Sequence, residues 1–241
     1  MRTLLAFAFG LLVTIAGSAR ADVGVEHSRL VYASDRPWVS MRVWNQGERS
    51  SLIQAWIDMG DPDAKPEALR APLMVTPPLF RLPPGGNRDL IVRAVDAASL
   101  PADRESLLWL NVLDIPARVQ SPDAGVEPEY AVRWRLKVFY RPASLVGTVE
   151  GAASSLVWRR AMDQQGNVRL QASNDSPFHV SLAGLSLGGV SLPLPPDRSV
   201  ISPHATWSLD LPSNADREGE LRIRWVNDQG TWEDRVAHLV L

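Results

Sequence analysis

The sequence has 241 residues, of which 45% are hydrophobic and 22% are charged, as is usual for a soluble globular protein. This length allows one large domain or two of about 100 to 120 residues each. The net charge of −2 offers no overall attraction for nucleic acid or for an anionic membrane surface, and the lack of cysteine excludes disulfides, so a buried core must stabilise the fold.

Residues 1–21 have the features of a secretory signal peptide. A cation at Arg2 precedes an apolar run over residues 4–16, and the segment ends in the small-x-small sequence "ARA". The apolar run is shorter than the roughly 20 residues that span a bilayer, and no later run approaches that length. We therefore expect cleavage after Ala21, export to the periplasm and no membrane insertion. The mature chain then has 23 cations against 27 acidic residues, a net charge of −4.

From Asp22 onward the sequence consists of short runs rich in β-branched and aromatic residues, broken by turn residues. The first two runs are separated by "QGERS" and predict a hairpin. The turn "NDQG" (227–230) predicts that the last two runs form another hairpin, and only 96–106 is compatible with a turn of helix. The predicted strands lie at residues 38–45, 51–59, 89–95, 106–115, 129–140, 155–160, 167–173, 179–187, 220–226 and 231–241.

Regularly spaced short strands with turn signals are typical of β-sandwiches, and the length implies two of them. The boundary is expected in "RPASLVG" (141–147), where a proline ends the long strand. The sequence thus predicts an all-β protein with one sandwich domain over residues 22–142 and another over residues 143–241.

No group of residues supports catalysis or cofactor binding. The four histidines lack the spacing of metal ligands, no glycine-rich sequence matches a phosphate or dinucleotide loop, and no G-x-S-x-G motif occurs. We therefore expect no enzyme activity, no cofactor and no metal. Nine tryptophans suggest an alternative, a two-domain periplasmic or surface protein that binds carbohydrate or mediates adhesion. Most of them, however, alternate within predicted strands as core residues do.

One long strand alternates between apolar and polar residues. Its even positions from 126 to 136 are mostly apolar, and its odd positions include Arg133, Arg135 and Lys137. Lys137 is one of only two lysines in a chain with 23 arginines. An ordinary sandwich strand with one buried face explains the alternation, and periodicity alone favours this explanation. An edge strand that offers apolar side chains and free backbone groups to another chain also explains it.

Four segments of the first domain occur in a specific order and register. They are "LIQAWID" (52–58), "TPPLFRLPPGG" (76–86), "PADRESLLWLNVLDIP" (101–116) and "LKVFYRPA" (136–143), the third being the most specific. Together they closely resemble the periplasmic chaperones of the chaperone–usher pathway of pilus assembly. The resemblance continues more weakly through the second domain, where "VNDQG" (226–230) falls at the position of a hairpin.

The resemblance implies two immunoglobulin-like domains in a boomerang arrangement with a cleft between them. It also implies a non-enzymatic chaperone that inserts its strand at about 129–140 into the open groove of a pilus subunit. A basic pair, Arg29 and Lys137, is implied to hold the subunit's C-terminal carboxylate in the cleft. The implied donor side chains are Val126, Tyr130, Val132, Trp134 and Leu136.

Further implications concern partners and the contact between the domains. The chaperone would form one-to-one complexes with pilus subunits and deliver them to an outer-membrane usher; a self-capping dimer of the free protein is also compatible with the resemblance. Arg141, Glu105 and Asp228 match positions of an ion network that sets the cleft angle.

Pro128 departs from the pattern because it cannot donate a ladder hydrogen bond, which shortens the donor strand. Lys137 lies on the opposite strand face from the donor side chains, and the absence of a cysteine pair favours the short-loop branch.

Overall fold

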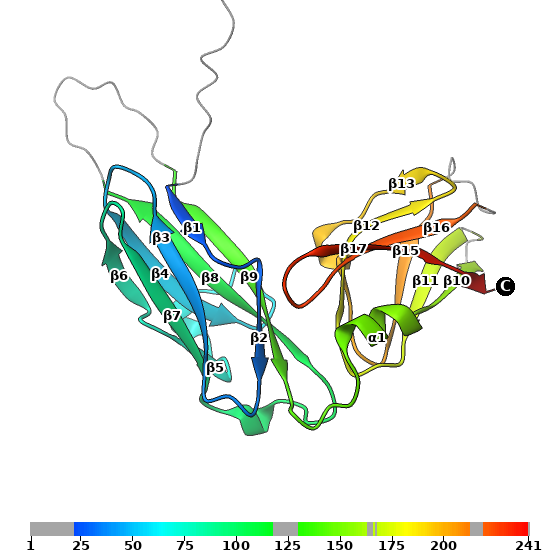
Figure 1. Cartoon of the computed structure of the whole chain (residues 1–241), viewed down its shortest axis with the longest axis horizontal. Coiled ribbons are helices and arrows are strands. Elements are labelled where there is room, and N and C mark those ends of the chain that lie inside the picture. Colours follow the sequence, from blue (N-terminus) through cyan, green and yellow to red (C-terminus); the bar gives the residue numbers. More distant parts are fainter. Residues whose placement is uncertain (1–21, 118–129, 163–165, 167, 213–218, 241) are drawn as a thin grey trace, which may run out of the picture.

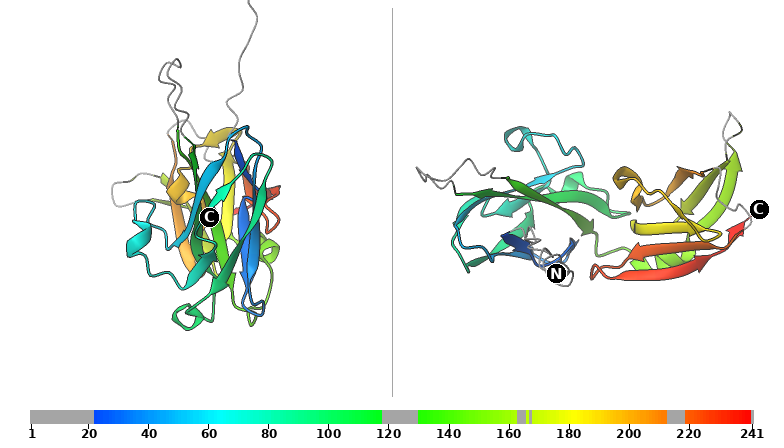
Figure 2. Two further views of the ribbon diagram at one scale, coloured as in Figure 1. Left: turned by 90° about the vertical axis from the view of Figure 1, so that its left-hand side faces the viewer. Right: turned by 90° about the horizontal axis from the view of Figure 1, so that it is seen from above.

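The computed structural model describes residues 22–117, 130–162, 166, 168–212 and 219–240, which form two β-sandwich domains lying side by side (Figure 1). Seen from above, the two bodies lie one after the other along the long axis of the molecule (Figure 2). Each body has its own hydrophobic core. The predicted all-β fold with two sandwich domains is confirmed.

The first domain packs a four-stranded sheet against a five-stranded sheet. In spatial order, the four-stranded sheet contains β1 (Val23–Val25), β3 (Val39–Asn45), β7 (Asn87–Ala94) and β5 (Leu73–Thr76). The five-stranded sheet contains β2 (Arg29–Ala33), β9 (Val132–Arg141), β8 (Ser106–Pro116), β4 (Ser51–Asp58) and β6 (Leu79–Leu82). Two short 3₁₀ turns, η1 (Pro66–Ala68) and η2 (Ala97–Ser99), lie in its loops.

The second domain repeats this arrangement. One of its sheets contains β15 (Ala205–Asp210), β11 (Val168–Asn174), β10 (Val157–Met162) and β18 (Leu239–Val240). The other contains β13 (Val190–Leu192), β12 (Val180–Leu187), β16 (Leu221–Val226) and β17 (Trp232–Ala237), with β14 (Val200–Ile201) pairing β12. The chain also forms α1 (Val149–Ser155) and the 3₁₀ turn η3 (Pro196–Arg198).

The cores are built from the alternation seen in the sequence. Successive side chains of a strand point to opposite faces, so the apolar alternate positions of two facing sheets meet in the middle. In β9, Leu136, Val138 and Tyr140 face the first core. In the second core, the rings of Trp158 and Trp207 pack edge to face with their centroids 5.9 Å apart.

The structure corrects one predicted hairpin. The runs 38–45 and 51–59 correspond to β3 and β4, which lie in different sheets and do not pair with each other. The prediction was wrong because the "QGERS" link crosses from one sheet to the other, while both strands still bury alternate residues in one core. The second hairpin is confirmed: β16 and β17 pair antiparallel, with Val226 opposite Trp232.

The helix α1 was not expected from the sequence. It begins after Thr148, whose side chain accepts a hydrogen bond from the backbone N–H of Gly151 at 3.0 Å and so caps the helix. Val149, Ala152 and Ala153 bury one side of it in the second core. The expected turn of helix within 96–106 is present as η2. Within the described ranges, no helix is long and apolar enough to span a membrane.

Candidate functional site

Two cations from distant parts of the sequence lie side by side where β2 meets β9. The two strands are parallel, and β2 begins at Arg29, directly opposite Lys137. Residues 26–28, just before β2, connect it to β1 in the other sheet, so the chain leaves the edge of β9 at this point. The fold therefore places next to each other the two residues that the resemblance implies as a basic pair.

Arg29 is 9% exposed and is held by groups from both domains. Its Nη1 donates to the carbonyl oxygen of Val226 in the second domain at 3.0 Å, and its guanidinium lies 5.7 Å from the centre of the Phe139 ring. Its Nε is buried and has no hydrogen-bond partner among the described residues. Burial lowers the pKa of Arg29, and the charge of Asp228 partly opposes this effect. The Nε–H group of Arg29 can therefore still donate a hydrogen bond to a ligand.

Lys137 is partly buried and makes no ion pair within the part of the chain that the structure describes. Its Nζ lies 5.8 Å from the centre of the Trp109 ring. Burial, and then the like charge of Arg29, lower the pKa of Lys137 to about 8. Two adjacent cations and an unpaired donor favour the binding of an anion. A single carboxylate would reduce the repulsion between Arg29 and Lys137 and would also accept a hydrogen bond from the Arg29 Nε.

Trp109 is fixed on the same outer face of the sheet by a second cation. The guanidinium carbon of Arg135 lies 4.0 Å from the centre of the Trp109 ring, and the Nη2 of Arg135 donates to Asp58 at 2.7 Å. Asp58 is almost fully buried and also accepts a hydrogen bond from Asn111 at 2.7 Å. This supported ring forms a rigid platform beside the Lys137 side chain.

The strand β9 has an open edge immediately before Lys137. On one side, β8 pairs with β9 continuously from Val132 to Tyr140. On the other side, β2 covers only Lys137 to Arg141. Among the described strands, none pairs with residues 132–136 on that side (Figure 1). A row of backbone donors and acceptors without a described strand partner therefore ends at the two cations.

The predicted donor side chains differ in their availability. Tyr130 is 76% exposed, and Val132, where β9 begins, is partly buried. Trp134 packs against the first core, and its indole N–H is buried without a described partner. Leu136 is a core residue with 6% exposure. Among the predicted donor residues that the structure describes, Leu136 is thus the one whose side chain already packs within the core of the first domain. Val126 lies outside the described residues, as does Pro128, so the predicted shortening at Pro128 is not addressed.

The opposite orientation of Lys137 and the donor side chains persists in the structure. The pairing of β8 with β9 runs from Val132 to Tyr140 without a register shift, so no bulge changes the alternation there. Even-numbered side chains face the sandwich interior, whereas Lys137 lies on the outer face beside Trp109. A strand added to the open edge would consequently meet apolar side chains on one face and cations on the other.

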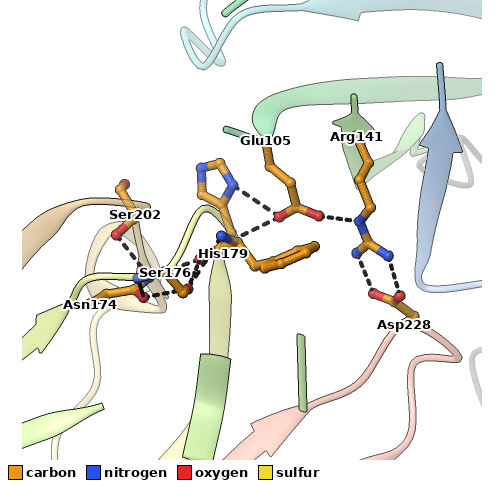
Figure 3. A network of polar contacts seen from close by, with 8 residues as sticks. Glu105, Arg141, Asn174, Ser176, His179, Ser202 and Asp228 are labelled. Atoms are coloured by element: carbon orange, nitrogen blue, oxygen red, sulfur yellow. Dashed lines mark hydrogen bonds and ion pairs between the residues drawn. The ribbon is translucent and has the colours of Figure 1, made fainter. Parts of the chain in front are cut away.

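A partly buried ion network joins the domains next to this site (Figure 3). The Nε of Arg141 donates to Glu105 at 2.6 Å, and its Nη1 and Nη2 donate to Asp228 at 2.7 and 2.9 Å. Glu105 also accepts a hydrogen bond from the backbone N–H of His179 at 2.8 Å. Burial alone would lower the pKa of Arg141, but its bonds to Asp228 and Glu105 outweigh burial and raise that pKa.

Sequence reasoning missed two contributors to this region. His179 packs its ring 5.7 Å from Phe139 and approaches Glu105, but no spacing in the sequence relates it to those residues. Val226 acts through its backbone carbonyl, which carries no sequence signal at all. The described residues contain no group of histidine and acidic side chains that would hold a metal.

Comparison with known proteins identifies the family. Residues 22–146 match the family described as "Pili and flagellar-assembly chaperone, PapD N-terminal domain", and residues 151–237 match "Pili assembly chaperone PapD, C-terminal domain". This chain belongs to the PapD-like pilus-assembly chaperones. The family is non-enzymatic, as the sequence predicted, and membership replaces the carbohydrate-binding alternative.

Individual relatives agree over most of the chain. The chaperone protein FimB/FhaD of Bordetella pertussis is 35% identical over 181 residues, which are 74% of this chain and 72% of that protein. The crystal structure of the Pseudomonas aeruginosa CupB2 chaperone has a TM-score of 0.71 and 32% identity, covering 90% of this chain and all of that one. The Salmonella enterica SafA pilin in complex with the SafB chaperone supplies a further match, with a TM-score of 0.73, 25% identity and coverage of 89% and 96%.

Proposed function

We propose that this chaperone captures a pilus subunit by strand addition at the open edge of β9, with the subunit's C-terminal carboxylate bound by Arg29 and Lys137. The observation that carries the proposal is the position of the two cations at the end of this edge. Backbone hydrogen bonds along residues 132–136 supply affinity, and the carboxylate sets the register. A pilin–chaperone complex among the similar structures supports the choice of partner.

The geometry also favours one direction for the added strand. A strand placed beside residues 132–136 lies in line with β2, which starts where the open edge ends. Its C-terminus reaches Arg29 and Lys137 only if it runs parallel to β9, as β2 does. The subunit's last strand therefore runs parallel to β9, and the chain ends at the basic pair.

Donor-strand complementation assigns the apolar side chains their role. Val132 is the first residue of β9 and is partly buried, and Tyr130 lies two residues before the strand with its side chain exposed. Next to them, Trp134 packs only at the margin of the first core. In the complex these side chains fill the groove that the subunit leaves open because it lacks a strand of its own. The chaperone thereby completes the fold of the subunit without nucleotide or cofactor.

The remaining steps of the proposal follow the pathway of the family. The protein is exported by its signal peptide, which is removed after Ala21, and it acts in the periplasm. It delivers each subunit, in a one-to-one complex, to an outer-membrane usher. When free, it shields its open edge in a self-capping dimer. The network of Arg141, Glu105 and Asp228 holds the domains at the angle that this cleft requires.

A charge placed at Tyr130 tests whether this side chain enters an apolar groove. We expect Tyr130→Glu to weaken capture of a pilus subunit by roughly 100-fold or more, because a buried carboxyl must give up its charge or remain unpaired. Met162→Glu is the matched control, since Met162 is also 76% exposed but lies in the second domain. Affinity is measured by titrating a refolding subunit with each chaperone. Equal affinities of the two variants would remove Tyr130 from the donor set.

A further inference from the structure

The hairpin tip formed by residues 226–232 of the second domain contacts the first domain at three places around the basic pair. The carbonyl oxygen of Val226 accepts a hydrogen bond from Arg29 at 3.0 Å. Two residues later, Asp228 binds Arg141 through two hydrogen bonds. At Gly230, an added Cβ atom would lie 2.6 Å from the Oγ of Ser28, the residue before Arg29. The tip therefore lies against the first domain at Ser28 and Arg141 as well as at Arg29.

The bond from Arg29 to Val226 determines where the rest of the guanidinium points. A guanidinium is planar and holds its five N–H donors in a fixed fork, so one fixed donor and one packed face define the directions of the others. In Arg29, Val226 engages Nη1 and the Phe139 ring lies near the guanidinium. The Nε donor is left buried and unpartnered within the described residues. The orientation of this donor is consequently set by a group from the other domain.

We infer that the hairpin tip is a positioning element of the carboxylate anchor: the Val226 carbonyl, kept in place by the contacts of Asp228 and Gly230, aims the Arg29 guanidinium at the bound anion. This inference rests on the proposed function, because it presupposes that Arg29 and Lys137 bind a carboxylate. The second domain then completes the binding site without touching the anion. Because coupling is reciprocal, carboxylate binding in turn strengthens the contact between the domains.

A wedge between Gly230 and Ser28 tests the inference without altering the anchor. Gly230 has φ +81, a conformation that asparagine tolerates better than most other residues, so Gly230→Asn adds bulk at Ser28 with less backbone strain than another side chain would cause. Gly189→Asn is the matched control, because Gly189 has φ +80 in the same domain and nothing within 4 Å of an added Cβ. Ser28→Asn introduces the wedge from the other side and carries the test if Gly230→Asn does not fold.

The chain's two lysines allow a direct readout of anion binding. Protein labelled with carbon-13 at lysine Cε gives one NMR signal from Lys137 and one from Lys65. N-acetylvaline, as the carboxylate, and N-acetylvaline amide, as its neutral analogue, are titrated separately into each variant. The Lys137 signal reports binding at the anchor, and the Lys65 signal corrects for unspecific effects. Because the two ligands differ only in the carboxylate group, the difference between their affinities measures binding at the anchor and not contacts along the donor strand.

We expect wild type and Gly189→Asn to prefer the acid equally, and the wedge variants to lose about five- to tenfold of that preference. A general loss of stability would not produce this pattern, because the glycine control experiences the same backbone change. If wild type prefers the acid and Gly230→Asn does so equally, the inference is overturned while the anchor stands. The inference is also overturned if Gly230→Asn and the control Gly189→Asn lose the preference for the acid to the same extent. If wild type shows no preference, the anchor in the proposed function fails.

Discussion

Replacing Lys137 with methionine is expected to weaken subunit capture by roughly 10- to 100-fold, the effect of losing one charge-assisted hydrogen bond to the subunit's carboxylate. Methionine keeps an unbranched apolar side chain beside Trp109. It also removes a desolvated charge next to Arg29, so the free chaperone should be no less stable at neutral pH. Affinity is measured by titration of a pilus subunit, and stability by urea unfolding.

Two further variants separate charge from side-chain shape. Lys65→Met is the control, because Lys65 lies at the exposed start of η1, away from β9. Lys137→Arg keeps a cation but replaces a compact ammonium with a planar fork beside a second arginine. If Lys137→Met captures subunits as tightly as wild type, the carboxylate is not held by this residue. If Lys137→Arg captures them fully, the choice of lysine has no role beyond charge.

Capture should weaken with rising pH near pH 8, the second large effect that we expect. The pKa of Lys137 is lowered to about 8 by burial and by Arg29, and only the charged ammonium attracts a carboxylate. Carboxylate binding raises this pKa again, so the affinity is highest below pH 8 and falls above it. Between pH 7 and pH 9 we expect a loss of about tenfold in wild type and little change in Lys137→Arg.

The stability of the free chaperone should change in the opposite direction over this range. Lysine in the unfolded chain keeps its ordinary pKa of 10.5, so between pH 8 and 10.5 the unfolded state binds more protons than the folded state at Lys137. The contribution of Lys137 to the free energy of unfolding therefore rises with pH. The difference between wild type and Lys137→Met isolates this contribution. An affinity that is constant from pH 7 to pH 9 would contradict the proposed role of the ammonium.

The sequence allowed the fold class to be predicted because strand alternation is a local property. Leu136, Val138 and Tyr140 in β9 are spaced two residues apart, and the structure buries all three in one core. The connection of β3 to β4 was not predictable in the same way. A five-residue link allows either a hairpin or a crossing to the facing sheet, and only the packing of the whole core decides between them.

The candidate site shows a similar division. Arg29 and Lys137 were nominated from motifs that they share with the chaperones, but their direct pairing depends on the parallel register of β2 and β9. The sequence does not distinguish a donor side chain from a core side chain at Leu136, because both are apolar and both occupy even-numbered positions of the strand. A backbone contact such as that of Val226 cannot be predicted from the type of residue, because every residue has a carbonyl group.

Amide hydrogen exchange along β9 tests the central claim most directly. It is measured in the free chaperone and in its purified complex with a pilus subunit, with the second-domain strand β11 as the internal reference. Strand addition predicts that the amides of residues 132–136 that point away from β8 gain at least about tenfold protection, because the partner's carbonyls now accept their hydrogen bonds. Unchanged exchange of these amides in an intact complex would contradict capture at the open edge of β9.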